Sequence, residues 1–108
     1  SEGMDVTAGR DRPLSSYGVP AMHVAIHTAA VPDGKSNISP AAAELVRMGF
    51  NLSRLESVDR IKALAAALIS ECEVIRDARG KGAREAAIAI TEIQTASFFA
   101  VAAATADL

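Results

Sequence analysis

The feature that most constrains this 108-residue chain is a run of five consecutive apolar residues, Ala86 to Ile90, inside an alanine-rich segment. A helix that is apolar on every face is normally buried on every face. A domain of this length buries only about two-thirds of the surface that its unfolded chain exposes, so its own core is modest. The missing cover is most easily supplied by another copy of the chain, and the sequence therefore predicts a homo-oligomer.

Two long helices are predicted around this run, the second from about Ala83 to about Ala104. Apolar or small residues recur along it at steps of three and four, which is typical of one packed helix face. They are Ile90, Ile93, Ser97, Ala100 and Ala104. A stripe with the same spacing precedes it and comprises Val58, Ile61, Ala65, Leu68, Cys72 and Ile75. The loop between the helices is short and contains Gly80 and Gly82, so we expect an antiparallel helical hairpin.

A short helix is expected before the hairpin, in the segment NISPAAAELVRMGF. Ser39 suits its N-cap, Pro40 its first position, and Gly49 a left-handed stop just past its end. Ser53 and Glu56 have capping-box spacing at the start of the next helix, where they would satisfy two backbone donors.

Residues 1–38 are interpreted as an N-terminal arm, and residues 39–108 as the helical domain. The arm contains two turn-forming stretches, DRPLSSYGVP and PDGKSN. Between them AMHVAIHT alternates, with Met22, Val24 and Ile26 on one side and His23, Ala25 and His27 on the other. This pattern indicates a strand, and the competing interpretation is an extended arm that wraps a neighbouring subunit. The opening SEGM is consistent with a native start at Met4 that follows a tag remnant, residues 1–3.

Charge and composition exclude several classes of protein. The formal net charge of −2 and the pI near 5.6 argue against a protein that coats a nucleic acid polymer, which requires a basic face. A small anionic ligand needs only a few cations. The single cysteine, Cys72, excludes an internal disulfide and falls at an apolar helical position, which favours packing over thiol chemistry. We expect no membrane span and no signal peptide, because no apolar run approaches about 20 residues and no basic segment precedes one. A soluble intracellular protein fits best.

No catalytic motif is present. The sequence has no nucleophile elbow, no phosphate-binding glycine loop and no cluster of carboxylates, so an enzyme is disfavoured. His23 and His27 are four residues apart, a spacing that presents two metal ligands on a helix. Their segment looks extended and no third ligand is obvious, so we interpret them as polar residues on the exposed side of a strand and expect no metal.

Arg84 is the most unusual cation in the chain, because it lies in the first turn of a predicted helix, where the helix dipole favours an anion. Arg84, Ile88 and Thr91 share one face, so a phosphate bound by the arginine would place a base or sugar within reach of the threonine hydroxyl. The alternative is an ion pair that leaves Thr91 merely packed. The carboxylates available for it are Glu85, Asp77 and a neighbour's Glu92. Spacing alone leaves both interpretations open.

A second candidate site lies earlier in the chain. Phe50 and Asn51 are followed by Arg60 and Lys62, and an aromatic ring for base stacking beside cations for phosphate is the chemistry of a nucleotide pocket. In the alternative interpretation Phe50 packs under the helix start as a hydrophobic staple and the cations are solvated.

Two stretches carry a family resemblance. REAAIAITEIQTASFFAVAAA, residues 84–104, resembles the C-terminal helix of small phage proteins that act as cyclic-nucleotide sponges, the anti-CBASS proteins and the related Thoeris anti-defence proteins. The shared pattern runs from Arg-Glu through Ala-Ile-Thr to an aromatic pair, where many relatives have Trp or Met instead of Phe98 and Phe99. FNLSRLESVDRIKALAAALI, residues 50–69, is similar to the segment before and within their second helix.

The resemblance implies a mainly α fold in which helical hairpins interlock as dimers and then as a homohexamer. It implies a phage-encoded protein of the host cytoplasm that binds cyclic dinucleotides, cyclic trinucleotides or cyclic ADP-ribose isomers without cleaving them. Arg84 and Thr91 would match residues that hold a cyclic trinucleotide, and Phe50 and Lys62 the pocket for smaller ligands. Residues 1–38 match nothing in this resemblance. The alternative function is a structural or adaptor helical oligomer with no small-molecule ligand.

Overall fold

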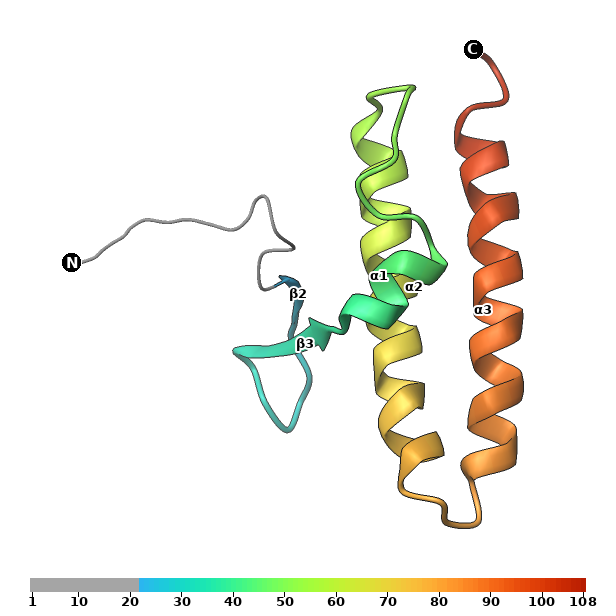
Figure 1. The fold of residues 1–108 in the computed structure, drawn as a ribbon. Helices are drawn as coiled ribbons and strands as arrows, with labels where there is room; N and C mark the ends of the chain where they lie inside the picture. The colour runs from blue at the N-terminus through green and yellow to red at the C-terminus, as the bar shows by residue number, and fades with distance from the viewer. Residues whose placement is uncertain (1–21) are drawn as a thin grey trace, which may run out of the picture.

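The computed structural model describes residues 22–108, which form two strands and three helices (Figure 1). They are β2 (Met22–Ile26), β3 (Gly34–Ile38), α1 (Pro40–Leu45), α2 (Glu56–Asp77) and α3 (Ala83–Ala104). Helices α2 and α3 stand side by side, and α1 and the strand pair lie against α2. The expectations for the tag remnant, for the start at Met4 and for the rest of residues 1–21 lie outside the described part of the chain.

The predicted strand is confirmed over Met22–Ile26, which includes His23 and ends just before His27. β2 pairs antiparallel with β3, so that Met22 lies opposite Ile38 and Ile26 opposite Gly34. Met22 and Val24 pack against the core, whereas His23 is exposed. The segment therefore forms a β-hairpin with its own chain.

The antiparallel helical hairpin is also confirmed, and α3 has the predicted bounds. On α3 the predicted stripe faces α2, with Ile90 and Ser97 buried and its other members partly buried. The stripe predicted on α2 is only partly right, because Leu68 and Ile75 are about half exposed. Helix α2 packs against α3 on one side and against α1 and β3 on another. Its buried positions are Val58, Lys62, Ala66, Ala67, Ile69 and Ser70, a face rotated from the predicted one.

The start of α1 agrees with the prediction and its end does not. Ser39 is the N-cap, with its hydroxyl accepting from the Ala42 N–H at 3.0 Å. The helix ends in a Schellman-type turn, in which the Met48 N–H donates to the Ala43 carbonyl. The left-handed residue of that turn is Arg47, with φ 58°, where an L side chain costs about 1–2 kcal/mol. Gly49 also has a positive φ, 88°, but it follows the turn.

The predicted capping box is wrong. Helix α2 begins at Glu56 with Leu55 at the N-cap, and no side chain caps it. The Ser53 hydroxyl donates instead to Asn51 Oδ1 at 2.6 Å. The Asn51 amide thereby makes hydrogen bonds within the loop that precedes α2.

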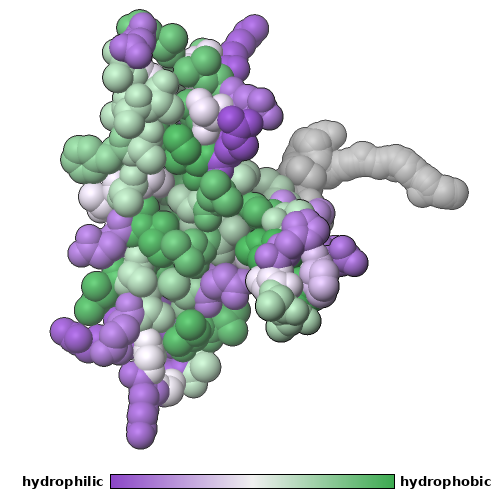
Figure 2. Space-filling model, turned by 180° about the vertical axis from the view of Figure 1, so that it is seen from behind, coloured by the Kyte–Doolittle hydropathy of each residue, from purple (hydrophilic) through white to green (hydrophobic). Residues whose placement is uncertain are grey.

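The all-round apolar run on α3 is covered on one side only within a single chain. Ala86 and Ile90 are buried against α2, whereas Ala87 is exposed and Ile88 is 44% exposed. Figure 2 shows a broad apolar surface over the helical hairpin, seen from behind. The large exposed apolar residues of the two long helices are Leu64, Leu68, Val74, Ile75, Ile88, Phe98 and Phe99. These surfaces leave apolar area for a further partner to cover.

Helix α3 bears on the expectation that the chain has no membrane span. Among residues 22–108 it is the helix long and apolar enough, by length and composition alone, to cross a membrane. Helix α3 is this apolar because it is rich in alanine and isoleucine. One of its faces packs along α2. Cys72 is partly buried, as the packing interpretation requires.

Candidate functional site

The residues predicted to bind ligand fall into two groups in different parts of the hairpin. Phe50, Asn51 and Lys62 come together beside the start of α2, where the loop that follows α1 passes over the helix. Arg84 lies at the other end, next to the α2–α3 turn, and Thr91 is two turns further along α3. The structure therefore does not bring the two groups together within one chain.

Lys62 is a buried cation with no carboxylate partner among residues 22–108. It is only 7% exposed, and its ammonium donates to the backbone carbonyls of Arg47, at 3.0 Å, and Phe50. Burial of an ammonium is costly unless a counter-charge or hydrogen bonds compensate it. Two carbonyls satisfy two of its three N–H groups and leave the positive charge available to an anion.

The Phe50 ring is exposed next to this charge. Phe50 is 58% exposed, and the Lys62 nitrogen lies 5.6 Å from its ring centroid, within cation–π range. Both residues line a hollow of about 190 Å³. Its other lining residues are Asn51, Leu52, Ser53, Val58, Val101 and Thr105. An exposed ring beside a buried ammonium combines a stacking surface with an anion-binding charge.

Asn51 holds the loop that carries Phe50. Its amide nitrogen donates to the Leu55 carbonyl at 2.9 Å and to Asp59 Oδ1 at 3.0 Å. Its amide oxygen accepts from the Arg54 N–H at 3.0 Å and from the Ser53 hydroxyl. Both its donors and both its acceptor positions are thus used inside the chain, which makes Asn51 a residue that positions the loop.

Arg60 lies apart from this cluster. Its guanidinium pairs with Glu56, one turn earlier, at 2.9 Å, and both side chains are mostly exposed. Residues two positions apart on a helix are separated by about 200° around its axis, so Arg60 and Lys62 point to nearly opposite sides of α2.

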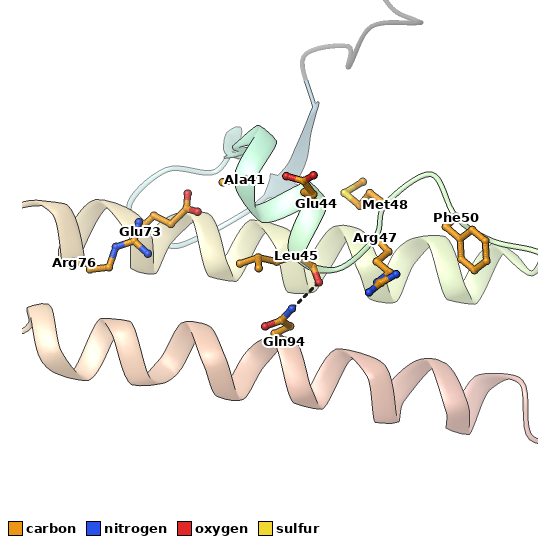
Figure 3. A pocket seen from close by; sticks show the side chains of 9 residues that line it. All are labelled: Ala41, Glu44, Leu45, Arg47, Met48, Phe50, Glu73, Arg76 and Gln94. Atoms are coloured by element: carbon orange, nitrogen blue, oxygen red, sulfur yellow. Dashed lines mark hydrogen bonds between the residues drawn. The ribbon is translucent and has the colours of Figure 1, made fainter.

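A larger groove, which the sequence did not predict, runs beside α1 and over α2 (Figure 3). Its volume is about 780 Å³. Arg47 and Phe50 lie towards one end, Glu73 and Arg76 towards the other, and Gln94 bridges from α3 to the Leu45 carbonyl at 3.1 Å. The remaining lining residues are Ala41, Glu44, Leu45 and Met48. The groove's lining residues come from α1, the loop that follows it, α2 and α3, so no local sequence pattern marks them.

The second predicted group lies on the face of α3 that points away from α2. Arg84, Ile88 and Thr91 are all exposed, and the Thr91 hydroxyl donates a long hydrogen bond, 3.5 Å, to the Ala87 carbonyl. Within residues 22–108 Arg84 forms no ion pair, so neither Glu85 nor Asp77 of its own chain neutralises it. The alternative of a neighbour's carboxylate stays open.

Arg84 also lines a hollow of about 440 Å³ at the hairpin turn, together with Arg76, Asp77, Arg79 and Ala83. Arg76 pairs with Asp77 at 2.9 Å. The hydrogen bond that Arg76 donates to Asp77, followed by the charge of that carboxylate, raises the pKa of Arg76 above its ordinary value.

Metal chemistry has no visible basis in the described residues, which contain no cluster of three or more His, Cys, Asp or Glu side chains able to hold an ion.

One family model matches the chain, the Acb2/Tad1 hairpin domain, over residues 41–105. The match covers more than half of the chain and includes α2, α3 and both groups of candidate residues. The chain belongs to the Acb2/Tad1 hairpin domain family. This confirms the resemblance to the phage anti-CBASS and anti-Thoeris sponge proteins. Neither the curated proteins nor the solved structures gave a match to the chain.

Membership of the Acb2/Tad1 family implies a cyclic-nucleotide sponge. Sponges of this kind are generally non-catalytic, and an anti-defence role of phage origin implies that they work in the host cytoplasm.

Proposed function

We propose that this Acb2/Tad1 hairpin protein binds and sequesters cyclic oligonucleotide or cyclic ADP-ribose-type second messengers without cleaving them, and so blocks host anti-phage signalling. The observation that best supports this proposal is the buried ammonium of Lys62, which has no carboxylate partner among residues 22–108, beside the exposed Phe50 ring. Both residues lie within the segment that matches the family.

Smaller ligands, cyclic dinucleotides or cyclic ADP-ribose isomers, are assigned to the Phe50 and Lys62 cluster. A base stacks on the Phe50 ring, a contact worth about 1–3 kcal/mol. A ligand phosphate approaches Lys62 and compensates its charge in a partly desolvated place, where the attraction is stronger than in water. Asn51 acts by holding the loop, and Arg60 contributes only if a neighbouring copy brings the ligand to it.

Cyclic trinucleotides are assigned to the exposed face of α3. Arg84 binds a phosphate. Thr91 donates a hydrogen bond to a base or sugar, or accepts one from it, and Ile88 supplies apolar contact between them. One exposed helix face encloses little of a ligand, so this site requires the same face of other copies. The proposal therefore includes a homo-oligomer, built from dimers towards a hexamer, in which residues 39–108 form the binding domain and residues 1–38 an arm.

The test is calorimetric titration of the protein with a panel of cyclic dinucleotides, cyclic trinucleotides and cyclic ADP-ribose isomers. At a ligand concentration about 100-fold above the dissociation constant, binding stabilises the fold by about 2.7 kcal/mol, which thermal unfolding would also detect. Ligand recovered chemically intact after the complex is heated supports sequestration over hydrolysis. No binding by any member of the panel near 0.1 mM would refute the proposal.

The alternative function is a structural or adaptor oligomer, which the exposed apolar surface of α2 and α3 favours. It predicts that Arg84→Ala changes no ligand interaction. Loss of trinucleotide binding in that variant, with assembly unchanged by light scattering, decides against the alternative.

A further inference from the structure

The turn between α2 and α3 gathers positive charge in a protein that is acidic as a whole. Three arginines, Arg76, Arg79 and Arg84, line the same hollow of about 440 Å³, and Asp77 is the one acidic residue in its lining. The lining therefore carries three positive charges and one negative charge, against a formal net charge of −2 for the chain. Among residues 22–108 the Asp77 carboxylate pairs with Arg76, and Arg79 and Arg84 form no ion pair.

Arg79 holds its place in a backbone conformation that arginine does not favour. It follows the end of α2 with φ 57°, in the left-handed region, where glycine is the usual residue. Gly80 and Gly82 lie immediately beyond, so glycine is plentiful in this turn but absent at the strained position. A strained non-glycine residue beside a hollow is a reason to ask what its side chain does there.

Arg76 links the two larger hollows. Its Nε donates to Asp77 at 2.9 Å, which leaves the terminal amino groups of the guanidinium for another acceptor. Arg76 lines both the hollow at the turn and the groove beside α1. Guanidinium groups present paired donors that match the oxygens of a phosphate.

We propose that the α2–α3 turn is a phosphate-binding site in which Arg76 and Arg79 share with Arg84 one phosphate or phosphodiester group. This inference rests on the proposed function where it takes a cyclic trinucleotide as the source of that group, and the site extends the trinucleotide contact from the face of α3 onto the end of α2. The same chemistry also accommodates a separate inorganic phosphate or pyrophosphate. Arg79 keeps its strained conformation because the site uses its charge.

The decisive variant is Arg79→Gly, with Arg54→Gly as the matched control. Arg54 has φ 60°, so both variants remove one positive charge and relieve the same backbone strain. Arg54 lies in the loop before α2 and lines none of the three hollows described above. The two variants should therefore unfold at similar temperatures, and any difference in anion binding belongs to the turn.

The first arm titrates inorganic pyrophosphate into the full chain and follows the arginine side-chain N–H signals by NMR. We expect saturable shifts in the wild type and in Arg54→Gly, and an affinity at least about tenfold weaker in Arg79→Gly. Equal pyrophosphate affinity in the two variants, or no saturable shift in the wild type, would overturn the inference. This arm does not depend on any cyclic nucleotide, so it decides the inference even if the proposed function fails.

The second arm identifies the source of the phosphate by calorimetric titration of a cyclic triadenylate into the same variants. A loss of about tenfold in Arg79→Gly alone assigns the anion to the bound nucleotide. Unchanged triadenylate affinity, with weakened pyrophosphate binding, overturns the shared contact and assigns the turn to a free phosphate. Absence of triadenylate binding in the wild type counts against the proposed function and leaves the pyrophosphate result standing.

Discussion

Replacing Phe50 by leucine distinguishes base stacking from simple packing under the helix start. Phe50 is 58% exposed, so less than half of the residue contributes to the core, and leucine retains most of that apolar area. The main internal loss is the cation–π contact with Lys62 at 5.6 Å, worth about 0.5–1 kcal/mol at an exposed site. The fold should therefore lose about 1 kcal/mol, a shift of about 4–8 °C in thermal unfolding.

Ligand binding should change far more than stability. Stacking of one base on an aromatic ring contributes about 1–3 kcal/mol, which corresponds to a loss of about 5- to 150-fold in affinity. Calorimetry with a cyclic dinucleotide and a cyclic ADP-ribose isomer measures this loss. Phe50→Tyr keeps the ring and should bind within about threefold of the wild type.

Leu52→Ala is the matched control for position 50. Leu52 lines the same hollow and is 84% exposed, so its truncation removes apolar surface but no ring. Unchanged affinity in Phe50→Leu, or an equal loss in Leu52→Ala, would show that Phe50 only packs, and the stacking argument would be refuted.

Three further perturbations address the other site, the fold and the assembly. Arg84→Ala should abolish binding of cyclic trinucleotides and spare the smaller ligands; loss of both classes by an intact oligomer, measured by calorimetry and light scattering, contradicts separate sites. Ser39→Ala removes the cap on the Ala42 N–H and the hydroxyl that donates to Glu73, so urea unfolding should report a loss of about 1–2 kcal/mol in the free energy of unfolding. An unchanged midpoint would mean that water replaces the cap. Leu68→Glu places a charge on a residue that is 52% exposed in the single chain and should reduce the mass measured by light scattering with little loss of helix; an unaltered mass excludes this surface from assembly.

The sequence predicted α3 better than α2 because the two helices have different numbers of partners. Helix α3 packs mainly on α2, so one stripe at helical spacing describes its buried face. Helix α2 also packs against α1 and β3, so Ile69 is buried, whereas Leu68 stays exposed. Periodicity finds a single face and cannot anticipate a second partner that arrives from elsewhere in the chain.

Local capping rules failed where side chains had a stronger alternative. Ser53 has the spacing of a capping box with Glu56, but its hydroxyl bonds to Asn51. Similarly, glycine at position 49 predicted the helix stop, and the structure uses Arg47 instead. Sequence rules could not predict the strained arginines, because those rules assign left-handed positions to glycine.

The sequence predicted the residues of one candidate site more completely than those of the other, for a related reason. Arg84 and Thr91 share a face as soon as the helix exists, so spacing alone identified them. Lys62 was predicted as a cation, but its burial depends on the path of the loop that brings the carbonyls of Arg47 and Phe50 over it. A long-range backbone contact of this kind leaves no local pattern in the sequence.

The positions of the two sites along the hairpin determine how ligands relate to assembly. Lys62 lies fifteen residues before the end of α2, or about 22 Å along the helix axis at about 1.5 Å per residue, whereas Arg84 lies in the first turn of α3. A single phosphate cannot touch both cations in one chain. If one ligand class depends on both cations, the two contacts must come from different copies. The affinity for that ligand will then decrease as the protein is diluted and the assembly dissociates. If the sites are separate, the Lys62 ligand binds at concentrations where only single hairpins remain, and binding measured across a dilution series distinguishes the two cases.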